Sequence, residues 1–339
     1  METINISSSK KRLDYIDSAR GIGIVLVVFG HLLNQNSDLY SIIYSFHVPF
    51  FFLLSGMFLN PTLKFVSYLL KYIKRLLFPY VVVFLIGVLF TSLYSGFNSL
   101  KPDELFSQFI YANPIKIHVG PIWFFACFFD SVILFYFFYK TILSKVNYLF
   151  SCISIGVLCI VAFYIPQIET KTGIYLPFKL DVSFMALVFL SIGYIFKKQI
   201  MKQESLSSIK KIITLLILVF LVVTISHFLI GQTYLSGGLY GHDIFLYIFT
   251  ALCGSLLIII LGMIFERIRI LCLIGKESLL IFSLHSLLIT LFNQILSCLG
   301  LETSFIFSII GVCLVVPIML VFAIAINAIK KKIFKVFVN

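Results

Sequence analysis

A short set of ionisable side chains interrupts the long apolar stretches of this sequence, and these side chains have the chemistry to act within a membrane. Each group of this kind costs several kcal/mol in a bilayer unless it is paired or faces water. A neutral imidazole removes a proton near physiological pH, so the histidines are candidate general bases. The residues are Arg20, His31, His47, Asp130, Asp181, His227, Glu277 and His285.

Arg20 and His31 lie on the same face of the first apolar stretch if that stretch is a helix. They are eleven positions apart, which at roughly 100° per residue brings them within about 20° of each other and about 16 Å apart along the axis. Gly21, Gly23 and Gly30 flank the pair and permit close approach of another helix or a ligand. The pair alone supports two interpretations equally: a functional pair, or a snorkelling arginine with a packed histidine.

His47 lies in the second apolar stretch, within a His-Val-Pro sequence that ends at Pro49. The short connection between the first two stretches makes their helices antiparallel neighbours, so we expect His31 and His47 at similar depth. Pro49 would free a backbone carbonyl near His47, which membrane helices tolerate where a side chain or water compensates. A simple helix kink would account for Pro49 equally well.

Several basic residues are expected on the same side of the membrane as Arg20, which stands at the N-terminal end of the first apolar stretch. Lys74 and Arg75, shortly before Pro79, are expected on the same side of the membrane. Such cations suit the phosphates of a cytoplasmic ligand, and they are also ordinary signals of membrane topology. The sequence has no GxSxG elbow, HExxH pair or Walker loop, so these common catalytic signatures offer no guide.

The composition assigns the whole chain to the membrane. Of its 339 residues, 60% are hydrophobic and only 12% are charged, and the mean hydropathy is +1.09. An average soluble chain is roughly a quarter charged, and a bilayer takes about 20 apolar helical residues per crossing. We therefore predict an all-α, polytopic membrane helix bundle of about ten transmembrane helices. The predicted spans are 19–39, 40–59, 76–97, 120–139, 146–165, 177–196, 212–231, 244–265, 273–295 and 304–329.

The distribution of cations predicts the orientation. The chain has 26 Lys and Arg residues and a net charge of +12. With the N-terminus in the cytoplasm, all of these cations fall at cytoplasmic ends or loops except four, so the positive-inside rule places both termini in the cytoplasm. The net charge then reflects topology and an anionic lipid surface, and no nucleic-acid partner is needed. The four exceptions are Lys101, Lys116, Lys171 and Lys179.

We divide the chain into a cytoplasmic N-terminal segment (1–18), a ten-helix membrane domain (19–329) and a basic cytoplasmic tail (330–339). The seven cysteines are scattered through or beside the apolar stretches without a CxxC pair. This pattern argues against a disulfide framework or a zinc site, so no metal is expected. The sequence does not indicate an oligomeric state.

The order and spacing of several motifs resemble acyltransferase family three, the bacterial membrane O-acyltransferases. In that family Arg-x10-His lies on the first span, as Arg20 and His31 do here. The resemblance extends from about Tyr15 to Ala328, and the His-x-Pro context of His47 is most similar to the fucose 4-O-acetylase-like members. The matching stretches are Asp17-Ser18-Ala19-Arg20-Gly21, Phe50 to Gly56 (FFxxSG), Lys74-Arg75 with Pro79, Ile122 to Phe125, Leu190 to Tyr194, and Gly275 to Ser278 followed by His285.

The resemblance implies transfer of an acyl group, usually acetyl, from cytoplasmic acyl-CoA to a hydroxyl of a cell-surface polysaccharide or of a lipid-linked, undecaprenyl-type glycan. It implies a location in the bacterial cytoplasmic membrane. Many larger relatives carry an extracytoplasmic domain that completes transfer. We expect instead that the acceptor enters the bundle or that a separate protein finishes the reaction.

The resemblance also suggests a role for each polar residue. His31 would be the base that activates the acceptor hydroxyl, and His47 would orient it, relay its proton or hold the acceptor. The CoA phosphates would contact a set of cations at the inner mouth: Arg20, Lys74 and Arg75. Supporting or acceptor-side candidates are Asp17, which would position Arg20, with Ser55, Trp123, Asp130, Glu277 and His285. Asp181, His227 and Lys179 have no assigned role.

A glycolipid or solute transporter, or a flippase, is the main alternative, because a ten-helix bundle with a histidine-lined cavity could also move a substrate. A nonenzymatic assembly protein is a third possibility. Cytoplasmic cations aligned with an intramembrane histidine favour the CoA enzyme, because proton-coupled transport would more naturally use intramembrane carboxylates, which are few here.

Overall fold

The structure is a computed structural model that describes residues 13–96, 100–302 and 304–338. Within these ranges, the side chains of Leu229 and of residues 330–338 are not described. Residues 1–12 of the predicted N-terminal segment and the side chains of the predicted tail, 330–339, therefore lie outside the described part. The α-helices are α1 Asp14–Leu32, α2 Asp38–Tyr44, α3 His47–Gly56, α4 Phe65–Tyr72, α5 Phe78–Ser95, α6 Pro102–Tyr111, α7 Trp123–Phe138, α8 Tyr148–Thr172, α9 Leu180–Met201, α10 Ser208–Ile225, α11 Ile244–Ile264, α12 Arg269–Lys276, α13 Ser278–Cys298 and α14 Phe305–Val338. A hairpin of two short strands, β1 Thr233–Tyr234 and β2 Leu239–Tyr240, joins α10 to α11.

Ten helical segments within the described residues are long and apolar enough to cross a membrane. Each overlaps one of the ten spans expected from hydropathy, which confirms the predicted all-α, polytopic bundle. The second segment consists of α2 and α3, and the third of α4 and α5 joined by a π-helical turn, Ile73–Leu77. The first helix begins at Asp14, earlier than residue 19, because Asp14 and Asp17 place negative charge in its first turn.

The second segment breaks just before His47, at Phe46, whose φ and ψ of −139° and −19° lie outside the helical region. Pro49 therefore stands in the first turn of α3, where its missing N–H removes no intrahelical hydrogen bond. The sequence left a kink open as one explanation of Pro49, and the structure has a break in this segment three residues before that proline. The break itself leaves carbonyls at the end of α2 free to accept other donors.

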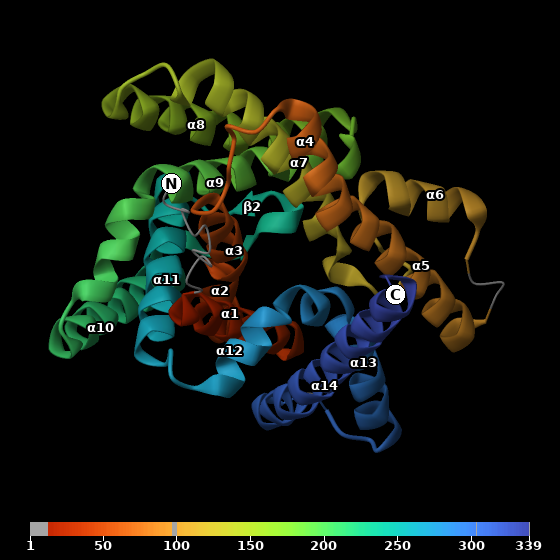
Figure 1. The fold of residues 1–339 in the computed structure, drawn as a ribbon. Coiled ribbons are helices and arrows are strands. Elements are labelled where there is room, and N and C mark those ends of the chain that lie inside the picture. The colour runs from red at the N-terminus through yellow and green to blue at the C-terminus, as the bar shows by residue number, and fades with distance from the viewer. Residues whose placement is uncertain (1–12, 97–99, 303, 339) are drawn as a thin grey trace, which may run out of the picture.

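α1 lies near the middle of the bundle, with α11, α12, α13 and α14 packed around it (Figure 1). Two pairs of glycines set the closest helix contacts. A Cβ on Gly21 or Gly275 would overlap the backbone of the facing helix, α12 or α1 respectively. The same reciprocal arrangement joins α3 to α9 through Gly56 and Gly193. Each of these glycines belongs to one of the motifs identified above, so the motifs include helix-packing positions as well as polar ones.

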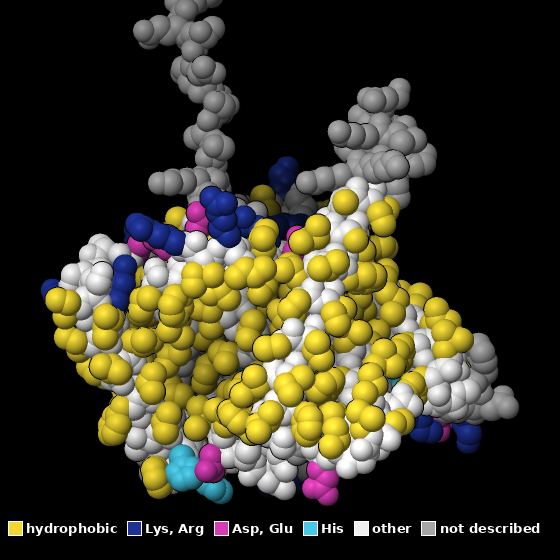
Figure 2. All heavy atoms as spheres, turned by 90° about the horizontal axis from the view of Figure 1, so that it is seen from below, with side chains coloured by type: hydrophobic (Ala, Val, Ile, Leu, Met, Phe, Trp, Pro, Cys, Tyr) yellow, Lys and Arg dark blue, Asp and Glu magenta, His cyan; other side chains and the backbone are white. Residues whose placement is uncertain are grey.

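Charged side chains lie mainly at the two ends of the bundle. Figure 2 shows a broad hydrophobic band with most of the visible Lys and Arg along one edge and the visible His at the other. We call the first edge the basic face. From the order of the ten segments, we assign to it the cations near their ends on that side: Lys74, Arg75, Lys197, Lys198, Arg267, Arg269 and Lys276. The opposite face carries the C-terminal end of α1 and the β1–β2 hairpin. The positive-inside rule predicts that the basic face is cytoplasmic.

Candidate functional site

A cavity of about 240 Å³ lies near the opposite face, where α1, α2, α3, α7 and α13 meet the hairpin. We call it the histidine cavity. Its walls include His31, His47, Tyr44, Trp123, Ser236 and Phe282. The structure thus brings together three of the residues singled out in the sequence, one each from α1, α3 and α7.

His31 is the exposed imidazole of this cavity. Its Nδ1 lies 3.4 Å from the Tyr44 hydroxyl oxygen. The Tyr44 ring in turn packs edge-on against His47, with the ring centroids 4.6 Å apart. Tyr44 therefore links the two histidines. Tyr44 was not among the residues predicted from the sequence, because nothing in an aromatic-rich chain distinguishes one tyrosine from its neighbours.

His47 is buried, and its Nδ1 lies 2.8 Å from the Ile43 carbonyl oxygen, a carbonyl that the break between α2 and α3 exposes. A carbonyl only accepts, so Nδ1 carries the proton of the neutral ring. Nε2 of the neutral ring is consequently a hydrogen-bond acceptor. The break in the second segment thus fixes both the position of this imidazole and its tautomer.

His285 lies next to His31, with ring centroids 5.1 Å apart. Its Nδ1 lies 2.9 Å from the Phe282 carbonyl oxygen and 3.1 Å from that of Ile281, so Nδ1 again donates. Its Nε2 is buried and has no hydrogen-bond partner within the described residues. A buried acceptor left open is unusual in a folded protein, and here it lies beside the exposed imidazole of the cavity.

Of the three histidines, His31 is accessible, and His47 and His285 are buried. The Nδ1 atoms of the two buried rings donate to main-chain carbonyl oxygens. This arrangement can accept a proton from a hydroxyl group placed in the cavity. Among the residues that the structure describes, no group of His, Cys, Asp and Glu side chains has the geometry to hold a metal ion.

Arg20 lies about 16 Å from His31 along α1, toward the basic face. Its guanidinium Nη1 is 3.7 Å from Oδ1 of Asp17, and Asp17 is buried whereas the Arg20 side chain is 30% exposed. The carboxylate thus restrains the arginine on the helix face that also carries His31. Lys74 and Arg75 are exposed on the π-helical turn that joins α4 to α5.

A hollow of about 760 Å³ on the basic face was not anticipated from the sequence. Asp14 at the start of α1 lines it together with Arg267, Arg269 and Lys276. In the sequence these cations were interpreted only as signals of membrane topology. The Arg-x-Arg spacing of Arg267 and Arg269 was the one local pattern that could have indicated a site. Cys272 also lines the hollow, and burial, followed by the nearby Asp14 and Asp17, raises the pKa of its thiol, which keeps the thiol neutral.

Three other candidates lie outside the histidine cavity in the described chain. Ser55 is half-buried two turns beyond His47 on α3. Asp130 is half-buried on α7 and makes no hydrogen bond or ion pair with another described residue. Glu277 accepts a hydrogen bond of 2.7 Å from the Asn327 side-chain amide and so ties the start of α13 to α14.

The fold and this site define a multi-pass helical membrane protein with a basic end and a histidine-lined cavity on the same central helix. A family model described as an acyltransferase domain matches residues 13–327, and the chain therefore belongs to acyltransferase family 3. The match supports a membrane acyltransferase. No match was found among curated proteins or among solved structures.

Proposed function

We propose that the protein is an O-acyltransferase that moves an acyl group, most simply acetyl, from cytoplasmic acyl-CoA to a hydroxyl of a cell-surface polysaccharide or lipid-linked glycan. The His-x-Pro context of His47 favours a fucose 4-O-acetylase-like member in a bacterial cytoplasmic membrane. The observation that carries the proposal is the placement of Arg20 and His31 on one face of α1, with His31 exposed in a cavity.

The donor would bind from the basic face. Arg20 would hold a CoA phosphate with Lys74 and Arg75, and guanidinium groups suit phosphate because they donate two parallel hydrogen bonds. The pantetheine arm is an extended chain of about the length that separates Arg20 from His31 along the helix. The thioester would therefore reach the histidine cavity while the phosphates stay at the membrane surface.

The acceptor would enter from the opposite face. His31 would remove the proton from the acceptor hydroxyl as its oxygen attacks the thioester carbonyl carbon. The carbon–sulfur bond then breaks, and the departing CoA sulfur takes the proton from His31. For Nε2 of His31 to act as the base, Nδ1 carries a proton and donates it to the Tyr44 hydroxyl oxygen, which makes Tyr44 a positioning residue.

Replacement of Tyr44 by Phe is expected to lower kcat about tenfold with little change in KM for acetyl-CoA, because one hydrogen bond that orients the base is lost. The pH–rate profile should also shift, which a purely structural role would not produce. Tyr247→Phe is the matched control, because that buried hydroxyl has no hydrogen-bond partner in the described chain. Equal kinetics for Tyr44→Phe and wild type would exclude this positioning role.

Replacement of Arg20 by Ala is expected to raise KM for acetyl-CoA about tenfold or more, because a charge-assisted contact to phosphate is removed. Initial rates measured over a range of acetyl-CoA concentrations test this expectation. Lys145→Ala removes an exposed cation from the loop between α7 and α8 and should leave KM unchanged. An unchanged KM in Arg20→Ala would remove Arg20 from the donor site.

Transfer of a radiolabelled acetyl group from acetyl-CoA by the purified protein in lipid vesicles tests the function itself. Mass spectrometry of surface glycans should show an acyl-sized mass increment in wild-type cells that disappears in a deletion strain. Absence of CoA binding together with measurable solute uptake would overturn the proposal in favour of a transporter.

A further inference from the structure

A second pocket, of about 360 Å³, opens between α6, α8, α9 and the hairpin, and the proposed reaction does not use it. We call it the polar pocket. The residues that matter in its walls are Gln108, Tyr111, Glu169, Tyr175, Lys179 and Asp181. It lies at the C-terminal end of α8 and the N-terminal end of α9, which is the face where the acceptor would arrive.

The hairpin forms a wall shared by the two pockets. Ser236 lines the histidine cavity, and the next residue, Gly237, lines the polar pocket. Consecutive Cα atoms are about 3.8 Å apart. The two pockets are thus separated by no more than the short helical turn Leu235–Gly237, which an extended ligand would have to cross to occupy both.

The wall chemistry suits a ligand rich in hydroxyl groups. Glu169 and Asp181 are both 7% exposed and line the pocket together with Lys179. Two carboxyl groups against one ammonium leave these walls without net positive charge, which disfavours a strong anion and suits a neutral hydrogen-bonding ligand. Tyr111 and Tyr175 add exposed aromatic rings, on which the apolar face of a sugar ring can pack.

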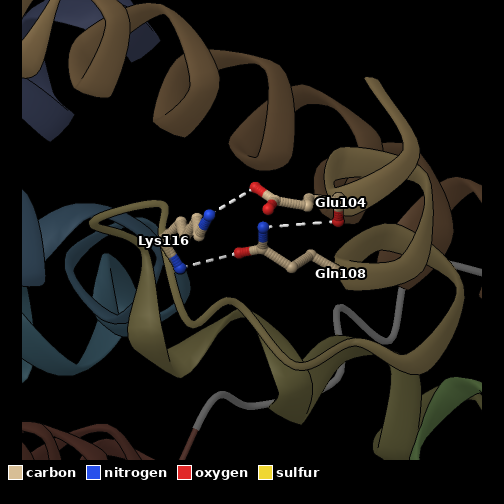
Figure 3. Close-up of polar contacts among 3 residues, drawn as sticks. All are labelled: Glu104, Gln108 and Lys116. Carbon is tan, nitrogen blue, oxygen red and sulfur yellow. Dashed lines mark hydrogen bonds and ion pairs between the residues drawn. The ribbon is translucent and has the colours of Figure 1, made fainter. Parts of the chain in front are cut away.

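Hydrogen bonds hold these walls in place. Figure 3 shows Gln108 between two partners: its Oε1 accepts from the Lys116 backbone N–H at 2.8 Å, and its Nε2 donates to the Glu104 carbonyl oxygen at 3.3 Å. An ion pair between Lys116 and Glu104 closes the same loop. On the other wall, Oε1 of Glu169 accepts from the Leu176 N–H at 2.6 Å.

Backbone strain is concentrated around this pocket. Ala112, Phe178 and Lys179 are the non-glycine residues with positive φ in the described chain, at 49°, 54° and 60°. Ala112 stands between two residues that line the pocket, and Lys179 lines it directly. Left-handed backbone at such residues is unfavourable and persists where the surroundings impose it, commonly at ligand sites.

We propose that the polar pocket binds a sugar unit next to the one that is acylated, so that the acceptor is an oligosaccharide or polysaccharide segment rather than a free monosaccharide. This inference rests on the proposed function, because it assigns the histidine cavity to the sugar whose hydroxyl reacts. Asp181 and Tyr175 would then determine which glycan is accepted, without contact with the reacting atoms.

The test uses oligosaccharides of increasing length, released from the surface polysaccharide of the deletion strain and therefore not acylated by this protein. Wild-type kcat/KM should rise about tenfold between one sugar and two or three. Asp181→Asn and Tyr175→Ala should remove that gain while leaving activity on the monosaccharide and KM for acetyl-CoA unchanged. Asp103→Asn and Tyr164→Ala, which alter exposed residues outside the pocket walls, are the matched controls.

Equal loss of activity on short and long acceptors in Asp181→Asn, or no loss on either, would overturn the inference. Failure of the proposed function has a different signature, which is no transfer by the wild-type protein to any acceptor. In that case calorimetric binding of the same oligosaccharides still tests the pocket, since binding lost in Asp181→Asn supports it and binding unchanged by Asp181→Asn contradicts it. Thermal unfolding of each variant separates loss of binding from loss of fold.

Discussion

Replacing His31 with alanine is expected to reduce acyl transfer by roughly 10²- to 10⁴-fold, the usual contribution of a positioned general base. The side chain is exposed in the histidine cavity rather than enclosed in the core. Its removal should therefore leave the amount of protein in the membrane unchanged. The measurement is the rate of acetyl transfer from acetyl-CoA to surface glycan, normalised to protein abundance, with His31→Gln as a second variant that keeps the polarity of the site.

His227→Ala is the matched control for the His31 variants. His227 lies near the same end of the bundle and is exposed, and its Nδ1 is 3.2 Å from a carboxylate oxygen of Asp38, outside the walls of the histidine cavity. Acyl transfer should be unchanged in this variant. A rate of acyl transfer in His31→Ala equal to that of the wild type, at normal protein abundance, would contradict the assignment of His31 as the base.

Replacing Gly275 with alanine is expected to destabilise the fold by about 1–3 kcal/mol, the range found when atoms are forced into a packed interface. The added methyl group would overlap the Asp17 carbonyl oxygen and crowd Gly21. These neighbours are backbone atoms, so rotation of a side chain cannot relieve the overlap, and α12 must move away from α1. Because Arg20 lies between Asp17 and Gly21, acyl transfer should fall along with the unfolding temperature.

Gly156→Ala provides the comparison for this stability effect. Gly156 is also in a helix, α8, but a Cβ at that position would meet no atom within 4 Å. Its unfolding temperature in detergent should equal that of the wild type or exceed it slightly, because alanine favours the helix over glycine. The same unfolding temperature for Gly275→Ala and wild type would contradict the close contact between α1 and α12.

Features that depend on a local pattern of residues could be predicted from the amino-acid sequence. Hydropathy located ten spans, because a bilayer requires each crossing to be apolar over about 20 residues. The helical repeat placed Arg20 and His31 on one face without any knowledge of the neighbours. Motif order led to the acyltransferase family, and the family match then confirmed that assignment.

The surroundings of His31, by contrast, follow from how the helices pack together. His285 and the hairpin shared with the polar pocket come from segments far from His31 along the chain. Tyr44 is nearer in the chain, but no sequence pattern distinguishes it from the other tyrosines. In a soluble protein an amphipathic pattern shows which helix face turns inward. Here the lipid-facing and buried faces are both apolar, so the rotation and pairing of helices depend on packing between small residues and on polar contacts, which a single sequence does not display.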